Sequence, residues 1–146
     1  MSTPTQTRSW ILTNKPTDLA TTTDPSPTFA LETRDLPKLG SDQVLVRAMY
    51  YSNDPAQRGW ISPNIPNDRL YVQPVEVDEA MRTRGLGEVI ESTSEQIHKG
   101  TTVQGTLNWN EYVVLDASAV VPLQPLPGGL SLTHYLGALG GTGLPA

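Results

Sequence analysis

The sequence contains no cysteine and only two histidines, which excludes several kinds of stabilised or metal-dependent protein. Without cysteine there is no disulfide framework and no thiolate ligand for a metal, so a secreted, disulfide-stabilised domain is not indicated. A zinc site built from histidine and cysteine ligands is also out of reach. We therefore expect no metal site, and we expect His98 and His134 to be surface residues.

Clusters of basic residues and long apolar runs are also missing. The 146 residues carry a formal net charge of −5 at pH 7, with 10 Lys and Arg residues against 15 Asp and Glu. Nucleic acids and anionic membranes require clustered positive charge, and a membrane span requires about 20 apolar residues. The first residues lack the apolar stretch of a signal peptide. We expect a cytoplasmic globular domain with no nucleic-acid or membrane partner.

The residues that are present favour short strands joined by turns. Thirteen prolines in 146 residues are about twice the average frequency, and proline removes a donor from a β-ladder and breaks helices. A chain of this length has room for a single core, and close spacing of short strands is typical of a small barrel. Apolar and polar patterning predicts these strands over 8–14, 29–34, 43–52, 85–92, 101–105 and 109–115.

Two regions depart from the strand pattern. A short helical turn is predicted with Asp54 as its N-cap and Pro55 at its first position, and Arg58 is placed to form an ion pair with Asp54 four residues earlier. Near the end of the chain, leucines recur at helical spacing after Ser131, which is a suitable N-cap. This pattern predicts a helix over 131–139.

Three motifs, in this order, resemble one known family. Residues 51–59 contain Asp-Pro-x-x-Arg directly after a predicted strand, and residues 81–89, followed by Trp-x-Glu-Tyr at 109–112, are similar to the centre of that family's barrel. The segment 136–144 is similar to its helix into a second domain. The chain resembles the N-terminal GroES-like domain of the zinc-independent medium-chain dehydrogenase/reductase superfamily, in the group of prostaglandin and leukotriene reductases, curcumin reductase and alkenal double-bond reductases.

The resemblance implies a mainly β fold, a GroES-like partly open barrel with a short helical turn and one C-terminal helix. Residues 1–7 are polar and are expected to be flexible. The resemblance implies the barrel domain at 8–130 and, at 131–146, the start of a linker helix toward a nucleotide-binding domain. The Rossmann domain that would bind the dinucleotide is absent from these 146 residues. Gly85-x-Gly87 does not replace it, because the third glycine of the fingerprint is missing and a strand follows.

The resemblance also assigns residues to a cleft between the two domains. NADPH would be the cofactor of the full-length family, with Asn53, Thr142 and Gly143 contacting it once the missing domain is supplied; the chain alone is expected to bind none. A small apolar, carbonyl-bearing molecule would be the substrate. The expected substrate-binding residues are Tyr51, Arg58, Tyr71 and Met81.

Catalytic candidates follow from the chemistry of the same cleft. Asp54 and Tyr71 are the candidates, because a carboxyl group or a tyrosine facing an apolar cleft can act as a general acid. Arg82 and Arg84 leave the same face of an extended segment, and Arg84 could hold a carbonyl-bearing or anionic ligand. Each residue also has a structural alternative: Asp54 as a helix cap, Arg58 as its ion-pair partner, and Arg84 on a solvated edge.

Three departures from the family pattern stand out. Asn108 occupies a position where the family usually has glycine, Thr101 replaces an aspartate and Pro145 replaces a threonine.

Two functional hypotheses follow. In the first, the chain is the substrate-side domain of an NADPH-dependent enone or alkenal double-bond reductase and does not reduce its substrate alone. In the second, it is a stand-alone, cofactor-independent isomerase, dehydratase or cyclase, or a small-molecule binding protein. A homodimer is expected there, because losing the second domain would expose an apolar cleft wall.

Overall fold

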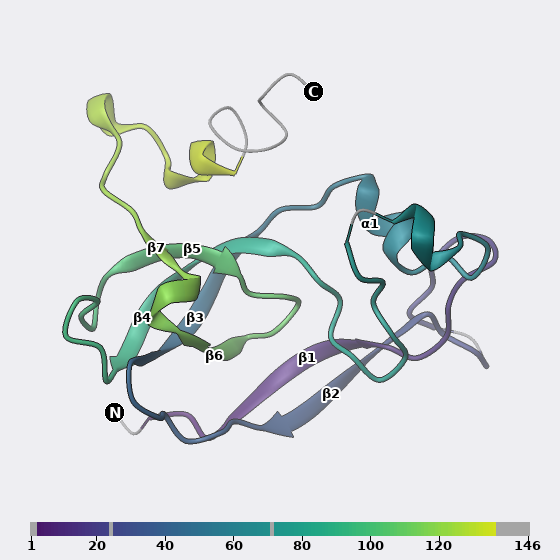
Figure 1. The fold of residues 1–146 in the computed structure, drawn as a ribbon, viewed down its shortest axis with the longest axis horizontal. Helices are drawn as coiled ribbons and strands as arrows, with labels where there is room; N and C mark the ends of the chain where they lie inside the picture. Colours follow the sequence, from purple (N-terminus) through teal and green to yellow (C-terminus); the bar gives the residue numbers. More distant parts are fainter. Residues whose placement is uncertain (1–2, 24, 71, 137–146) are drawn as a thin grey trace.

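The computed structural model describes residues 3–23, 25–70 and 72–136 (Figure 1). Within them, antiparallel strands form a two-stranded hairpin, β1-β2, and a five-stranded sheet of order β6-β3-β4-β5-β7. The two sheets stay open and do not close into a barrel, as the predicted mainly β, partly open fold requires. The strands are β1 Gln6–Leu12, β2 Phe29–Asp35, β3 Gln43–Tyr51, β4 Arg84–Ser92, β5 Thr102–Thr106, β6 Tyr112–Asp116 and β7 Val121–Pro122.

Helical structure is short throughout the described residues. The single α-helix there, α1, spans Ala56–Trp60 directly after β3 and confirms the predicted helical turn. Figure 1 shows α1 at the far end of the connection that leaves β3. One-turn 3-10 helices occur at Asn67–Arg69, Ala117–Ala119, Pro127–Gly129 and Leu132–Tyr135.

Strand β3 is an interior strand of the five-stranded sheet, with β6 on one side and β4 on the other. Val44 and Val46 are buried on one face and Leu45 on the other, which is the two-sided apolar pattern of a central strand. A register shift between Ala48 and Tyr50 interrupts the β3–β4 pairing. Beyond this shift the side chains of β3 are exposed, so Tyr50 and Tyr51 lie at the surface at the C-terminal end of the strand.

The hairpin is attached to the rest of the fold through the outer edge of β1. Trp10 N donates to Trp109 O at 3.0 Å, and Glu111 N donates to Arg8 O at 2.9 Å. A strand was expected over 109–115, but β6 begins only at Tyr112 because the preceding residues pair with β1 instead. The hairpin therefore packs below the five-stranded sheet, as Figure 1 shows.

Two apolar clusters form the core. One lies on the five-stranded sheet and contains Val44, Val46, Val89, Ile97, Val103, Leu107, Ala117 and Val120. The other joins the end of the hairpin to α1 and contains Leu12, Phe29, Ile61, Val75 and Met81. Phe29 packs against Trp109 with ring centroids 5.0 Å apart, so the hairpin shares one core with the segments on either side of it.

The ends of the chain differ from expectation. Residues 1–7 were expected to be flexible, but strand β1 already begins at Gln6. The buried Thr7 hydroxyl accepts a 2.9 Å hydrogen bond from Tyr112 N, which holds the start of the strand in place. Ser131 caps the C-terminal turn as expected, with its Oγ accepting from Thr133 N at 3.2 Å. That turn is a 3-10 helix where an α-helix was predicted, and the rest of the predicted helix lies outside the described residues.

Candidate functional site

Four of the predicted site residues, Tyr51, Asn53, Asp54 and Arg58, lie at or shortly after the C-terminal end of β3. Asp54 does not cap α1 with its side chain as the sequence suggested, because Pro55 is the N-cap and no side-chain cap bond forms there. The backbone carbonyl of Asp54 accepts from Gln57 N at 3.0 Å instead, and its carboxylate accepts from Ser52 Oγ at 3.2 Å. The neighbouring Asn53 is exposed.

Gln57 holds this turn in place and was not identified from the sequence. Its Oε1 accepts from Asp54 N at 2.8 Å, and its Nε2 donates to Arg82 O at 2.9 Å. The residue is only 9% exposed, so both bonds are shielded from water. A glutamine in a helical turn has no distinctive sequence signal, and its role became visible only with its burial and partners.

Arg58 binds backbone rather than Asp54. One of its guanidinium nitrogens, Nη2, donates to Pro16 O at 3.1 Å and to Asp18 O at 3.2 Å. Among the described residues no ion pair joins it to Asp54, because the carboxylate is turned toward Ser52. Arg58 therefore fastens the β1–β2 connection to α1, while its exposed remainder stays accessible to a ligand.

The other predicted binding residues are dispersed. Met81 is 1% exposed and lies in the second core cluster, so its side chain offers no surface to a substrate in this structure. Arg84 is exposed at the start of β4. Arg82 does not share that exposure, because it stacks on the Trp60 ring at 5.5 Å and donates to Gln73 O. Tyr71, Thr142 and Gly143 lie outside the described residues.

Tyr51 lines an aromatic hollow of about 300 Å³. Its hydroxyl donates a 2.6 Å hydrogen bond to Asn110 O. Burial of the phenol, and secondly the negative charge of Glu111, raise the pKa of Tyr51 above its ordinary value. The other residues around the hollow are Arg8, Trp10, Leu31, Ala48, Trp109 and Glu111; we refer to these seven residues as the Tyr51 hollow.

An ion pair stands at the edge of the Tyr51 hollow. Arg8 Nε and Nη2 contact Glu111 Oε2 at 2.9 and 2.5 Å. The hydrogen bonds and the negative charge of Glu111 raise the pKa of Arg8 above its ordinary value. Two indole rings, a leucine and a phenol beside one fixed ion pair suit a ligand with an apolar body and a single polar group.

The raised pKa of Tyr51 makes stability depend on alkaline pH. A tyrosine whose folded pKa exceeds its unfolded value of about 10 stabilises the fold below that pH, and this stabilisation is lost as the pH rises through the folded pKa. We expect the free energy of unfolding to fall as the pH rises above 10. In Tyr51→Phe this fall should be less steep, because the titrating phenol is gone. The same variant should be less stable by about 1 kcal/mol, because it lacks the hydrogen bond to Asn110. Urea unfolding between pH 7 and 11 measures this, with Tyr135→Phe as control; equal slopes in all three proteins would refute it.

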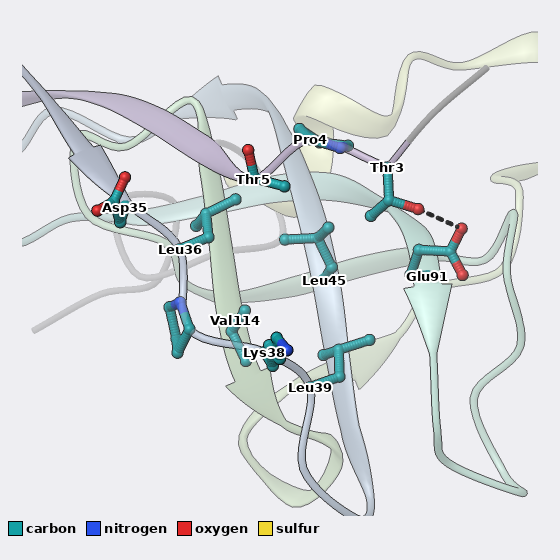
Figure 2. A pocket seen from close by; sticks show the side chains of 11 residues that line it. Thr3, Pro4, Thr5, Asp35, Leu36, Lys38, Leu39, Leu45, Glu91 and Val114 are labelled. Atoms are coloured by element: carbon teal, nitrogen blue, oxygen red, sulfur yellow. Dashed lines mark hydrogen bonds between the residues drawn. The ribbon is translucent and has the colours of Figure 1, made fainter.

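Another hollow lies elsewhere in the described residues. It has a volume of about 490 Å³ and lies where the N-terminal residues and the β2–β3 connection pass over the sheet (Figure 2). Leu45 contributes to its floor, six positions before Tyr51 on β3 and therefore about 20 Å away along the strand. None of the predicted site residues lines it.

Gly85 and Gly87 do not form a loop for the phosphates of a dinucleotide. Gly85 and Gly87 lie inside β4, where an added Cβ would meet the carbonyl oxygens of Tyr50 and Arg47, so both serve the close approach of β3 and β4. A phosphate loop would require glycines between a strand and a helix. No group of three metal-binding side chains is placed to hold an ion within the described part of the chain.

The family's glycine position before the tryptophan has a structural explanation. Asn108 adopts a φ of 56°, in the left-handed region that glycine occupies readily and asparagine tolerates. Its backbone N donates to Thr83 O at 3.0 Å. Asparagine at this position is thus compatible with the left-handed backbone conformation of the chain.

Comparisons with known proteins agree with this architecture. The Escherichia coli NADPH-dependent curcumin reductase is 31% identical over 95% of this chain and 37% of its own length. The tobacco NADP(+)-dependent 2-alkenal reductase is 30% identical over 73% of this chain and 30% of its own. A Saccharomyces cerevisiae protein named as an uncharacterized membrane protein is 32% identical over 95% of this chain and 40% of its own length. Among the residues described here, none of the helices has the length and apolar content of a membrane crossing.

Solved structures give the same result. The crystal structure of CurA from Vibrio vulnificus superposes with a TM-score of 0.72, at 27% identity over 92% of this chain and 37% of that one. A second structure of CurA, in complex with NADPH, also gives 0.72, at 25% identity. The chain thus spans 30–40% of the length of these relatives. The profile of the family described as the N-terminal domain of oxidoreductase matches residues 8–123, and the chain belongs to that family.

Proposed function

We propose that this chain is the substrate-side domain of an NADPH-dependent reductase of enone or alkenal double bonds, and that it does not reduce its substrate alone. The observation that carries the proposal is the similarity to curcumin and 2-alkenal reductases over 73–95% of this chain and only 30–37% of theirs. We propose that the cofactor-binding site is formed by residues beyond those described. NADPH, when bound, would supply the hydride.

The residues of this chain would bind and orient the organic substrate. The Tyr51 hollow presents an apolar aromatic wall for the body of a small carbonyl compound, with donors from Arg8 nearby. We propose that Tyr51, Arg58 and Arg84 contact the substrate and that Asn53 faces the cofactor. Asp54 and Tyr71 remain the proposed proton donors. Rigid positioning of this wall against the cofactor is what such a domain contributes to hydride transfer.

Titration with NADPH tests the proposal. We expect the fluorescence of micromolar NADPH to stay unchanged when the 146-residue chain is added, and we expect no NADPH to be consumed when a 2-alkenal is also present. The reason is that the described glycines serve strand packing and not phosphate binding. Micromolar NADPH binding with turnover would contradict the proposal. Conversion of the 2-alkenal without NADPH would contradict it as well and favour a cofactor-independent enzyme.

A separate measurement tests the substrate wall. We expect calorimetry to detect weak, saturable binding of the 2-alkenal that Trp10→Ala reduces at least fivefold, because Trp10 lines the Tyr51 hollow. Leu130→Ala removes a comparably exposed apolar side chain away from the hollow and serves as the matched control. Equal affinities in the two variants would remove the Tyr51 hollow from the proposal.

A further inference from the structure

One edge of the β1–β2 hairpin is open, and the hydrogen bonds of β1 identify it. Residues 8, 10 and 12 direct their backbone groups away from β2, toward 109–111 and 78–81. In an antiparallel ladder alternate residues face opposite edges, so residues 7, 9 and 11 bond to β2. Their register partners are Arg34, Glu32 and Ala30. The intervening residues of β2, at 31, 33 and 35, therefore face outward.

The outward-facing backbone N–H and C=O groups of β2 lack a backbone partner among the described residues. This unpaired edge has a limit at each end. At one limit Phe29 N donates to Thr21 O at 3.2 Å. At the other, Pro37 has no N–H to offer. Between them runs a five-residue edge, and Leu31 on this edge is 50% exposed. Such an edge is a template for another strand.

We propose that a second copy of this chain pairs with this edge, antiparallel and about a two-fold axis at Thr33. Thr33 then pairs with Thr33 of the second copy, and Leu31 with Asp35, through the outward-facing backbone groups. Glu32 comes to lie directly opposite Arg34 of the second copy, twice in the dimer. Opposite charges facing each other across strands stabilise the pairing.

Charge excludes the neighbouring registers. A two-fold axis at Glu32 places two carboxylates opposite each other, and an axis at Arg34 places two guanidinium groups together, both of which are destabilising. An axis at Leu31 requires the N–H of Phe29, which Thr21 already occupies. The axis at Thr33 alone uses every open group of the edge and pairs unlike charges.

The ion pairs already present are compatible with this dimer. Within one chain Arg34 Nη2 contacts Glu32 Oε2 at 2.9 Å and Asp78 Oδ1 at 2.8 Å. All three side chains are partly exposed, and a guanidinium has five donors. Each arginine can therefore add a carboxylate of the second copy. Because the ladder is only five residues long, we expect a weak, concentration-dependent dimer.

Sedimentation equilibrium of the 146-residue chain over a range of concentrations tests the dimer. Glu32→Arg sets like charges opposite each other and should raise the dissociation constant at least tenfold, while Glu32→Arg/Arg34→Glu restores unlike pairs and should return most of the affinity. Thr33→Pro removes an outward N–H that β1 does not use and should abolish the dimer. Glu95→Arg makes the same charge change at an exposed turn residue and should leave the dimer intact.

The outcomes separate this interface from the alternatives. A chain that stays monomeric at millimolar concentration, or a dimer that persists in folded Thr33→Pro, overturns the proposal and assigns any association to another surface. Circular dichroism establishes whether Thr33→Pro folds; if it does not, the single and double charge exchanges decide. None of these measurements involves NADPH or an alkenal, so the interface and the proposed function stand or fall separately.

Discussion

Met81→Ala should lower the free energy of unfolding by about 2–5 kcal/mol, the cost of emptying a large buried side chain from a packed core. The basis is its 1% exposure in the cluster with Leu12 and Val75. The family resemblance placed Met81 at a substrate cleft, where its removal would change ligand binding and leave stability nearly unaffected. Chemical denaturation distinguishes these two roles.

Met49→Ala is the matched control for Met81→Ala. Met49 is 38% exposed on β3, so its truncation should change stability by no more than about 0.5 kcal/mol. If Met81→Ala proved as harmless as Met49→Ala while weakening binding of a 2-alkenal, the core placement of Met81 would be wrong and the cleft role would be restored.

Gly87→Ala should destabilise the fold by about 3 kcal/mol or more, the upper end of overpacking costs. An added Cβ would lie 2.7 Å from Arg47 O and would also collide with Val46 Cγ1. Because one obstacle is backbone, β3 and β4 would have to separate at the centre of the sheet. Thermal and urea unfolding measure the loss.

Gly59→Ala provides the comparison for Gly87→Ala. Its added Cβ would meet Ile65 Cδ1 at 3.6 Å, an ordinary contact, and alanine is the better helix former in α1. We expect it to be neutral or stabilising by up to about 1 kcal/mol. A Gly87→Ala protein as stable as Gly59→Ala would show that β3 and β4 are not packed as described.

The parts of the fold that could be predicted are those governed by local pattern. Alternating and two-sided apolar residues placed β3 in the interior of a sheet, and Asp-Pro-x-x-Arg placed a helical turn after it. The start of β6 could not be predicted from the sequence. The apolar Trp109 fits the local pattern of a strand, but its carbonyl accepts a hydrogen bond from Trp10, about a hundred positions away. Such pairing depends on tertiary contacts that no local pattern encodes.

The candidate site was predicted less completely than the fold. Asp54 and Arg58 have the spacing of an i,i+4 ion pair, yet Ser52 and the carbonyls of Pro16 and Asp18 provide nearer partners. Gln57 was missed because its importance comes from two distant backbone groups converging on one buried amide. The Tyr51 hollow combines β1, β2, β3 and the residues before β6, and only the fold brings these together.

The attachment of β1 to residues 109–111 constrains how the chain acquires its structure. Ser9 Oγ donates to Asn110 Oδ1 across a separation of 101 residues, so the first strand emerges from the ribosome long before its outer partner exists. At about 5–20 residues per second, roughly 5–20 seconds separate the synthesis of Ser9 from that of Asn110. The same edge that anchors the finished domain is therefore open to misassembly during synthesis, and contacts of such long range also slow refolding.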